Sequence, residues 1–249
     1  MKRFAVIGGT GINELAGLTP SGRHSIKTPY GATSRPIEEG RIRGCTVYFL
    51  QRHGAPGAIP PHKINYRANL WALHSLGVTE VVAINAVGGI NPDMPTGALV
   101  VPDQIIDYTW GREHSIDDGA GGELLHIDFT RPYDETLRQT LLDLADDNSI
   151  RVCAPATHGI TQGPRLETAA EIARLEHDGC DVVGMTGMPE AALARELGMA
   201  YASICMVVNP AAGKGDQPIT LDMMRETLRR EAAVVESLLA HLFTASSSG

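Results

Sequence analysis

Residues 201–211 read YASICMVVNPA, an apolar run from Tyr201 to Val208 that passes directly into Asn209, Pro210 and Ala211. A continuous apolar run of this length, bounded by a turn signal, is typical of a strand buried on both faces. We therefore predict a central strand that presents Asn209 at its carboxyl end. The simpler interpretation is an Asn-Pro turn that only closes the strand.

Short runs rich in Val and Ile predict the other strands, and helical spacing predicts the segments between them. The strands are Phe4–Ile7, Thr46–Leu50, Val81–Ala86, Leu99–Val101, Ala154–Gln162 and Val182–Met185. The helices are Asn65–Leu76, Asp134–Asp146, Thr168–Glu176, Pro189–Leu197 and Leu221–Phe243, the last with Thr220 as its N-cap. This alternation favours an α/β fold with a mostly parallel or mixed sheet, in which ligands bind at the carboxyl ends of strands.

Composition limits the class of protein. The 249 residues are 43% hydrophobic and contain no linker, which predicts one domain over residues 1–244 and a flexible tail over 245–249. The net charge of -8 argues against a nucleic-acid partner. Four widely spaced cysteines without a CxxC pair, no membrane-length apolar run and a strand directly after Arg3 predict a cytoplasmic protein.

Four strand ends carry groups suited to an anion such as phosphate. Thr10 lies in the glycine-rich loop after the first strand, and Arg52-His53 follows the second. Asn85-Ala86 precedes two glycines, and Thr186 stands near a helix start. Taken singly, the glycine loop also fits a tight turn and the Arg-His pair a surface loop. Dinucleotide, P-loop, GxSxG and metal-ligand patterns are missing from the sequence.

Two side chains are suited to a 6-oxopurine base. The Asn209 carboxamide has donors and an acceptor in one plane, which match the N7 and O6 edge. Glu167 can accept a hydrogen bond from N1–H, which adenine lacks. Its alternative interpretation is a first-turn glutamate that the helix dipole favours.

The motifs IGGTG, QRHG, KINYRANLWAL, NAVGGINP, GPRLETAAE and GMTGMPE, in this order, resemble the trimeric purine nucleoside phosphorylase and methylthioadenosine phosphorylase family. The resemblance implies a twisted, barrel-like mixed sheet surrounded by helices, a homotrimer, and inorganic phosphate as co-substrate without a cofactor or metal. It places Thr10, Arg52, His53, Asn85, Ala86 and Thr186 around phosphate. It places Met185 at the ribose, Leu166, Glu167, Asn209, Pro210 and Ala211 at the base, and His126, lent by a neighbouring subunit, at the sugar's 5' end. Asn209, His53 and Arg52 are the expected catalytic residues.

Two departures from the family pattern indicate the substrate. Methylthioadenosine phosphorylases carry acidic residues where Asn209 and Ala211 stand here, and Leu221 stands in an apolar segment where inosine enzymes have a histidine for the 5' hydroxyl. An apolar 5' pocket favours a methylthio group. The combination resembles the S-methyl-5'-thioinosine phosphorylases and predicts phosphorolysis of that nucleoside. The alternatives are a general inosine or guanosine phosphorylase, a methylthioadenosine phosphorylase, a nucleoside hydrolase and a non-catalytic purine-binding protein.

Overall fold

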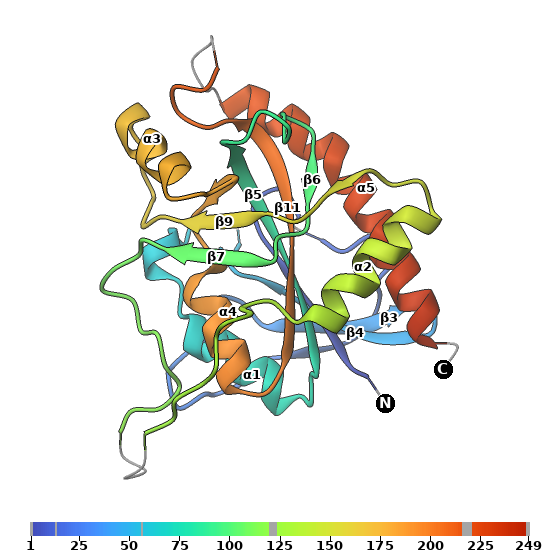
Figure 1. Cartoon of the computed structure of the whole chain (residues 1–249). Coiled ribbons are helices and arrows are strands. Elements are labelled where there is room, and N and C mark those ends of the chain that lie inside the picture. The colour runs from blue at the N-terminus through green and yellow to red at the C-terminus, as the bar shows by residue number, and fades with distance from the viewer. Residues whose placement is uncertain (1, 13, 56, 120–123, 216–220, 248–249) are drawn as a thin grey trace.

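Two long strands form the centre of the molecule. The computed structural model describes residues 2–12, 14–55, 57–119, 124–215 and 221–247. Within it, β5 (Glu80–Gly89) and β11 (Ala200–Pro210) pair in parallel along almost their whole length (Figure 1). Residues 201–209 of β11 are all buried, as the apolar run predicts.

The sheet branches at β5. On its first half β5 pairs in parallel with β1 (Phe4–Gly8), which pairs in parallel with β4 (Cys45–Gln51). The antiparallel strands β3 (Ile37–Ile42) and β2 (Thr19–His24) continue that side. Where β1 has ended, β5 pairs instead with β10 (Val182–Gly184), followed by β9 (Thr157–Ile160) and β7 (Gln104–Asp107). The short strands β6 (Leu99–Val100) and β8 (Val152–Cys153) extend the sheet beyond β11.

Helices cover both faces of the central strands. Successive residues of β1 point to opposite faces of the sheet. Phe4 and Val6 pack against α5 (Leu221–Ser247) and α2 (Glu135–Asp147) on one face. Ala5 and Ile7 pack against two other helices on the opposite face. Those helices, both labelled in Figure 1, are α1 (Tyr66–Ser75) and α4 (Gly187–Glu196). Helix α3 (Ala169–His177) packs against β10. The 3₁₀ helix Pro61–Lys63 precedes α1. The predicted α/β class with a mixed sheet and surrounding helices is confirmed.

Several predicted boundaries are wrong. The expected strand Ala154–Gln162 is shorter in the structure, where only β9 (Thr157–Ile160) falls within it. The preceding strand β8 ends at Cys153, and Pro155, which lies between the two strands, has no N–H to continue the ladder. Helix α5 continues to Ser247, beyond the predicted end at Phe243, so the proposed tail is helical up to that residue. Thr220, its predicted N-cap, lies outside the described residues. Of the helices that are described, none is long and apolar enough to span a membrane.

Candidate functional site

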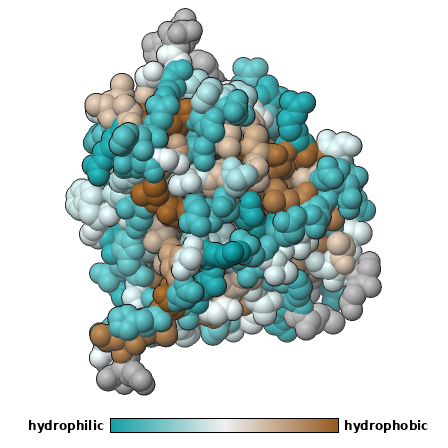
Figure 2. All heavy atoms as spheres, viewed as in Figure 1, coloured by the Kyte–Doolittle hydropathy of each residue, from teal (hydrophilic) through white to brown (hydrophobic). Residues whose placement is uncertain are grey.

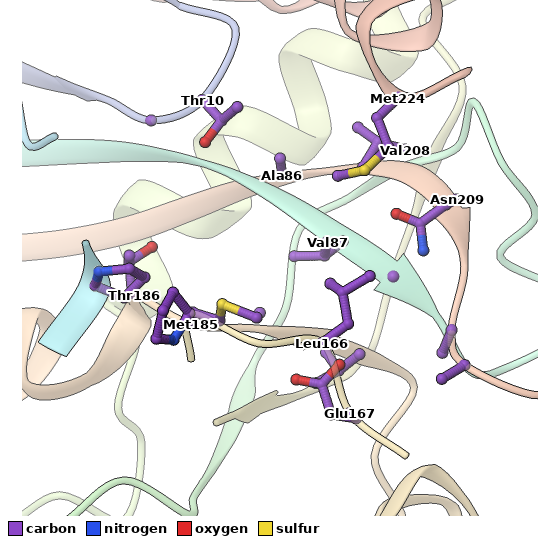
Figure 3. Close-up of a pocket in the computed structure, with 18 of the residues that line it drawn as sticks. Thr10, Ala86, Val87, Leu166, Glu167, Met185, Thr186, Val208, Asn209 and Met224 are labelled. Atoms are coloured by element: carbon purple, nitrogen blue, oxygen red, sulfur yellow. The ribbon is translucent and has the colours of Figure 1, made fainter. Parts of the chain in front are cut away.

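One cavity of about 300 Å³ lies at the carboxyl ends of β1, β4, β5 and β11 (Figure 3). These four strands are parallel along the pairs β4–β1–β5–β11, so their carboxyl ends share one edge of the sheet. Most of the residues predicted from the strand ends line this cavity: Thr10, Arg52, His53, Ala86, Leu166, Glu167, Met185, Thr186, Asn209 and Ala211.

Topology explains how Thr186 reaches the same place. Strand β10 runs antiparallel to β5 and pairs Val182 with Gly89 and Val183 with Gly88. The chain after β10 therefore returns along β5 towards Asn85. Accordingly, the Thr186 hydroxyl donates to Asn85 Oδ1 at 2.8 Å.

A β-bulge turns Asn209 towards the cavity. The pairing of β11 with β5 shifts between Val207 and Asn209, so that Val208 has no partner in the register. Consecutive residues of a regular strand point to opposite faces, whereas a bulge changes this alternation. Val208 and Asn209 consequently both line the cavity (Figure 3).

The Arg52 guanidinium is fully buried and its charge is paired inside the protein. Nε and Nη2 donate to the two carboxylate oxygens of Glu190 at 3.0 and 2.8 Å. Nη1 donates to the Ile84 carbonyl at 2.7 Å and to Asn85 Oδ1 at 3.2 Å. A guanidinium has five N–H donors, and four of them are used by described residues, which leaves one on Nη2. Arg52, expected from sequence to bind phosphate, thus forms an ion pair with Glu190 at the cavity wall, and the carboxylate balances its charge.

Glycine is required where the first loop passes this pair. A Cβ on Gly9 would lie 2.8 Å from Arg52 Nη1 and 2.5 Å from the Ile84 carbonyl oxygen. The tight turn and the close approach are both present, since Ile12 N donates to the Gly9 carbonyl at 3.3 Å. The loop therefore presents Thr10 at the cavity while leaving room for the guanidinium behind it.

His53 is held as one tautomer. Its Nδ1 lies 2.9 Å from the Ile59 carbonyl oxygen, an acceptor only, so Nδ1 carries the proton and Nε2 is the hydrogen-bond acceptor. Burial, with a smaller contribution from the Arg52 charge, lowers the pKa of His53. The imidazole is therefore neutral at neutral pH and offers a lone pair rather than a second cation to the cavity.

Asn85 lies behind the cavity wall and does not line it. Its Oδ1 accepts from Arg52 and Thr186, and its Nδ2 donates to Ser203 Oγ at 2.6 Å. The side chain is 2% exposed. Asn85, expected to contact phosphate, instead orients the two residues that do line the site. The donor of Thr186 is committed to it, which leaves the Thr186 oxygen as an acceptor.

At the other end of the cavity Asn209 is fixed by its own backbone. Nδ2 donates to the Pro210 carbonyl at 2.6 Å. Among the described residues this bond uses one amide hydrogen, so the second hydrogen and Oδ1 remain for a ligand. The free groups are therefore one donor and one acceptor in a plane, as the sequence predicts for a purine edge.

Glu167 is not a first-turn residue of a helix. Helix α3 begins after the N-cap Thr168, which forms a capping box with Glu171, so the helix dipole acts on Glu171. Glu167 stands before the cap and accepts from Thr161 Oγ1 at 2.5 Å. Leu166 covers the cavity beside it and is 45% exposed. The helix-dipole interpretation of Glu167 is thereby excluded.

Pro210 and His126, like Asn85, do not line the cavity. Pro210 turns away and lines a separate hollow beside Asn91 and Lys214. The Leu221 side chain lies outside the described part of the chain, whereas Met224, one turn further along α5, lines the cavity (Figure 3). His126 is exposed on the arm formed by residues 108–119 and 124–131, which projects from the body (Figure 1).

That arm carries apolar side chains on its surface. Trp110 is 71% exposed, Leu124 70% and Leu125 50%, and apolar residues gather on the projecting part (Figure 2). Clusters of this kind are typical of surfaces that contact another chain. His126 is exposed and directly follows Leu125 in this stretch.

Comparison with known proteins places the chain in one family. The model of the family described as Phosphorylase superfamily matches residues 3–244. A protein of Pseudomonas syringae pv. tomato named probable S-methyl-5'-thioinosine phosphorylase is 49% identical, over 99% of this chain and 100% of its own. The 6-oxopurine nucleoside phosphorylase of Pyrococcus furiosus is 41% identical, over 96% of this chain and 91% of its own.

Solved structures give the same result. Methylthioadenosine phosphorylase from Schistosoma mansoni, in complex with adenine, superposes with a TM-score of 0.95 at 32% identity. The match covers 100% of this chain and 93% of that protein.

Proposed function

The chain belongs to the phosphorylase superfamily, and we propose that it cleaves S-methyl-5'-thioinosine with inorganic phosphate to hypoxanthine and 5-methylthioribose 1-phosphate. One observation carries the proposal. The Asn209 amide, with a free donor and acceptor, and the Glu167 carboxylate line the same cavity as Thr10, His53 and Thr186. We call Asn209 and Glu167 the base reader, and Thr10, Arg52, His53 and Thr186 the phosphate pocket. Phosphorolysis of a nucleoside requires groups of both kinds at opposite ends of one cavity.

The base end supports hypoxanthine rather than adenine. As the bond between C1' and N9 breaks, its electron pair moves to the purine, and N7 of the purine takes a proton from solvent. Asn209 Oδ1 accepts from that N7–H, and the free Nδ2 hydrogen donates to O6. Glu167 accepts from N1–H, which only the 6-oxo base carries. Because these bonds strengthen as the base departs, they act on the transition state.

The phosphate end positions the nucleophile. A phosphate oxygen attacks C1' while the glycosidic bond breaks, and the sugar passes through a cation-like state. Thr10 and the remaining N–H of Arg52 donate to phosphate oxygens. The Nε2 of neutral His53 accepts the proton that a monohydrogen phosphate retains. No cofactor takes part in the proposed reaction, since placement and hydrogen bonding supply the catalysis.

Apolar side chains support the methylthio group at the 5' end. Met224 and Val208 stand together above the cavity near Asn209 (Figure 3). Neither side chain can hydrogen-bond strongly to a 5' hydroxyl, so burying that hydroxyl against them costs free energy that a methylthio group avoids. We therefore give Met224 the same role that the sequence predicts for Leu221, whose side chain lies outside the described part of the chain.

A general 6-oxopurine nucleoside phosphorylase is the second candidate. The identity to the Pyrococcus furiosus protein favours it, and it shares the same base and phosphate ends. The two candidates differ only in the 5' group that the cavity accepts. We also propose a homotrimer, in which a neighbouring subunit lends His126 to the site, and a cytoplasmic location.

A kinetic panel tests the proposal. S-methyl-5'-thioinosine, inosine and methylthioadenosine are compared by release of free base, with and without inorganic phosphate. We expect phosphate-dependent release of hypoxanthine, fastest from the methylthio compound. Equal rates on inosine support the second candidate, and preference for methylthioadenosine refutes the base assignment. Release without phosphate identifies a hydrolase, and binding without release identifies a purine-binding protein.

A further inference from the structure

Arg112 does not line the cavity, but it connects two segments of the chain that do. Its Nη1 donates to the backbone carbonyls of Met185 at 2.9 Å and Met188 at 2.5 Å. Its Nη2 donates to the carbonyls of Gln162 at 2.9 Å and Thr161 at 3.3 Å, and Nε donates to Gln162 Oε1 at 3.2 Å. One half-buried guanidinium therefore spans two separate stretches of backbone.

These stretches carry the two ends of the proposed site. Gln162 precedes Leu166 and Glu167 on the base side, whereas Met185 and Thr186 belong to the sugar and phosphate side. The β9–β10 ladder that joins the stretches ends at the pair Ile160–Gly184. One backbone bond follows it, from Thr161 N to the Gly184 carbonyl at 2.9 Å. Beyond that bond, Arg112 donates to carbonyls on both sides.

The chemistry of this contact requires arginine. The planar guanidinium presents five N–H donors in a fixed fork, which can reach carbonyls on opposite sides at once. A lysine ammonium has three donors on a single atom and cannot span both stretches. Although burial lowers the pKa of Arg112, its ordinary value is so high that the group stays cationic at neutral pH. The Tyr66 ring, 5.6 Å from the guanidinium carbon, packs against its face.

We propose that Arg112 is a positioning residue that holds residues 161–167 and 185–188 as one unit, and so fixes the distance between the base reader and the phosphate pocket. Its effect on catalysis rests on the proposed function, because only phosphorolysis needs both ends aligned across one sugar. Its effect on the backbone does not depend on which reaction the protein catalyses.

Hydrogen–deuterium exchange tests the backbone effect. In Arg112→Met we expect amides of both segments to exchange at least about tenfold faster, because backbone carbonyls in both segments lose their hydrogen-bond donor. Arg112→Lys should also raise the exchange rates of amides in both segments. It serves as a second variant if Arg112→Met does not fold. Faster exchange in one segment alone, or in neither, overturns the proposal.

Arg67→Met is the matched control. Arg67 pairs with Glu113 of the same arm at 3.2 Å and stacks on the Tyr30 ring, yet none of its contacts is to either segment. We expect unchanged exchange at residues 161–167 and 185–188 in this variant. An equal increase in the control would mean that loosening the arm suffices, which overturns the role of Arg112.

Kinetics provide the second measurement. A displacement of about 1 Å between reacting groups costs about 100-fold in rate, so kcat of Arg112→Met should fall by that order. Millimolar guanidinium should restore part of it, since the ion can reoccupy the vacated position. Unchanged kcat, or a loss that guanidinium does not relieve, overturns the positioning role. If the wild-type chain itself releases no base, the proposed function fails while the exchange experiment still decides the Arg112 proposal.

Discussion

Replacing Asn209 by aspartate changes the base reader by one group. In the native protein Nδ2 donates to the Pro210 carbonyl at 2.6 Å, and the residue is 7% exposed. The aspartate places a carboxylate oxygen where the amide nitrogen was, facing that carbonyl oxygen. The bond becomes a repulsion, and the free donor for purine O6 is removed.

The size of the effect follows from these contacts. A buried acceptor that loses its partner costs about 1–3 kcal/mol. If that loss falls on the transition state for the 6-oxo substrate, kcat/KM decreases by about 5- to 150-fold. A 6-aminopurine is affected less, because its exocyclic amine can donate to the new carboxylate. The preference for S-methyl-5'-thioinosine over methylthioadenosine should therefore fall by at least about tenfold.

The assay compares kcat/KM for both nucleosides at saturating phosphate in the native protein and in Asn209→Asp. Asn148→Asp is the matched control, because the Asn148 amide also donates to a backbone carbonyl, Leu144 at 2.8 Å, but on the exposed end of α2. It should leave both rate constants unchanged. An unaltered ratio in Asn209→Asp, with the protein folded, refutes the assignment of the amide to the base.

Three further predictions concern the cavity wall and the buried polar groups behind it. Met224→His should lower the ratio of kcat/KM for S-methyl-5'-thioinosine to that for inosine by about tenfold, since an imidazole can bond a 5' hydroxyl; a constant ratio places the 5' group elsewhere. Glu190→Gln should lower the free energy of unfolding by about 3–5 kcal/mol in urea titrations, because it leaves the Arg52 charge buried and unpaired; a loss below about 1 kcal/mol contradicts this. Burial lowers the pKa of His158 from 6.5 to about 3. Between these two pH values His158 is protonated in the unfolded chain and neutral in the folded protein. The free energy of unfolding therefore decreases as the pH falls, by about 1.4 kcal/mol per pH unit. His158→Gln should show a shallower decrease over this range, and parallel curves would disprove the shift.

The central strands could be predicted from sequence because both of their faces are buried. All residues of β1 are buried, and such strands appear as uninterrupted apolar runs. By contrast, β2 reads TPSGRH and β3 reads IEEGRI, and neither run is apolar or alternates regularly. These two strands are held by backbone pairing with each other and with β4, which leaves no clear trace in the side-chain pattern.

The site shows a similar division. Thr10, His53, Glu167 and Asn209 stand at strand or loop ends, where a local motif marks them, and the structure gathers them in one cavity. The contacts made behind the cavity wall by Glu190 and Arg112 were not predicted. Glu190 lies 138 residues from Arg52 in sequence, and Arg112 contacts carbonyls 49 to 76 residues away. No local pattern contains such a pairing, although a glutamate in the apolar segment Gly187–Leu193 is a signal that the carboxylate needs a buried partner.

The phosphate end of the cavity is close to neutral, which bears on how the proposed reaction gains its rate. Glu190 balances the Arg52 charge, and His53 carries none at neutral pH. A strongly cationic pocket would stabilise phosphate equally before and during the reaction, and such uniform binding does not raise kcat. In a neutral pocket the phosphate dianion keeps its charge available for the sugar cation that forms beside it. The electrostatic attraction between these two then grows only as the glycosidic bond breaks, so it acts on the transition state.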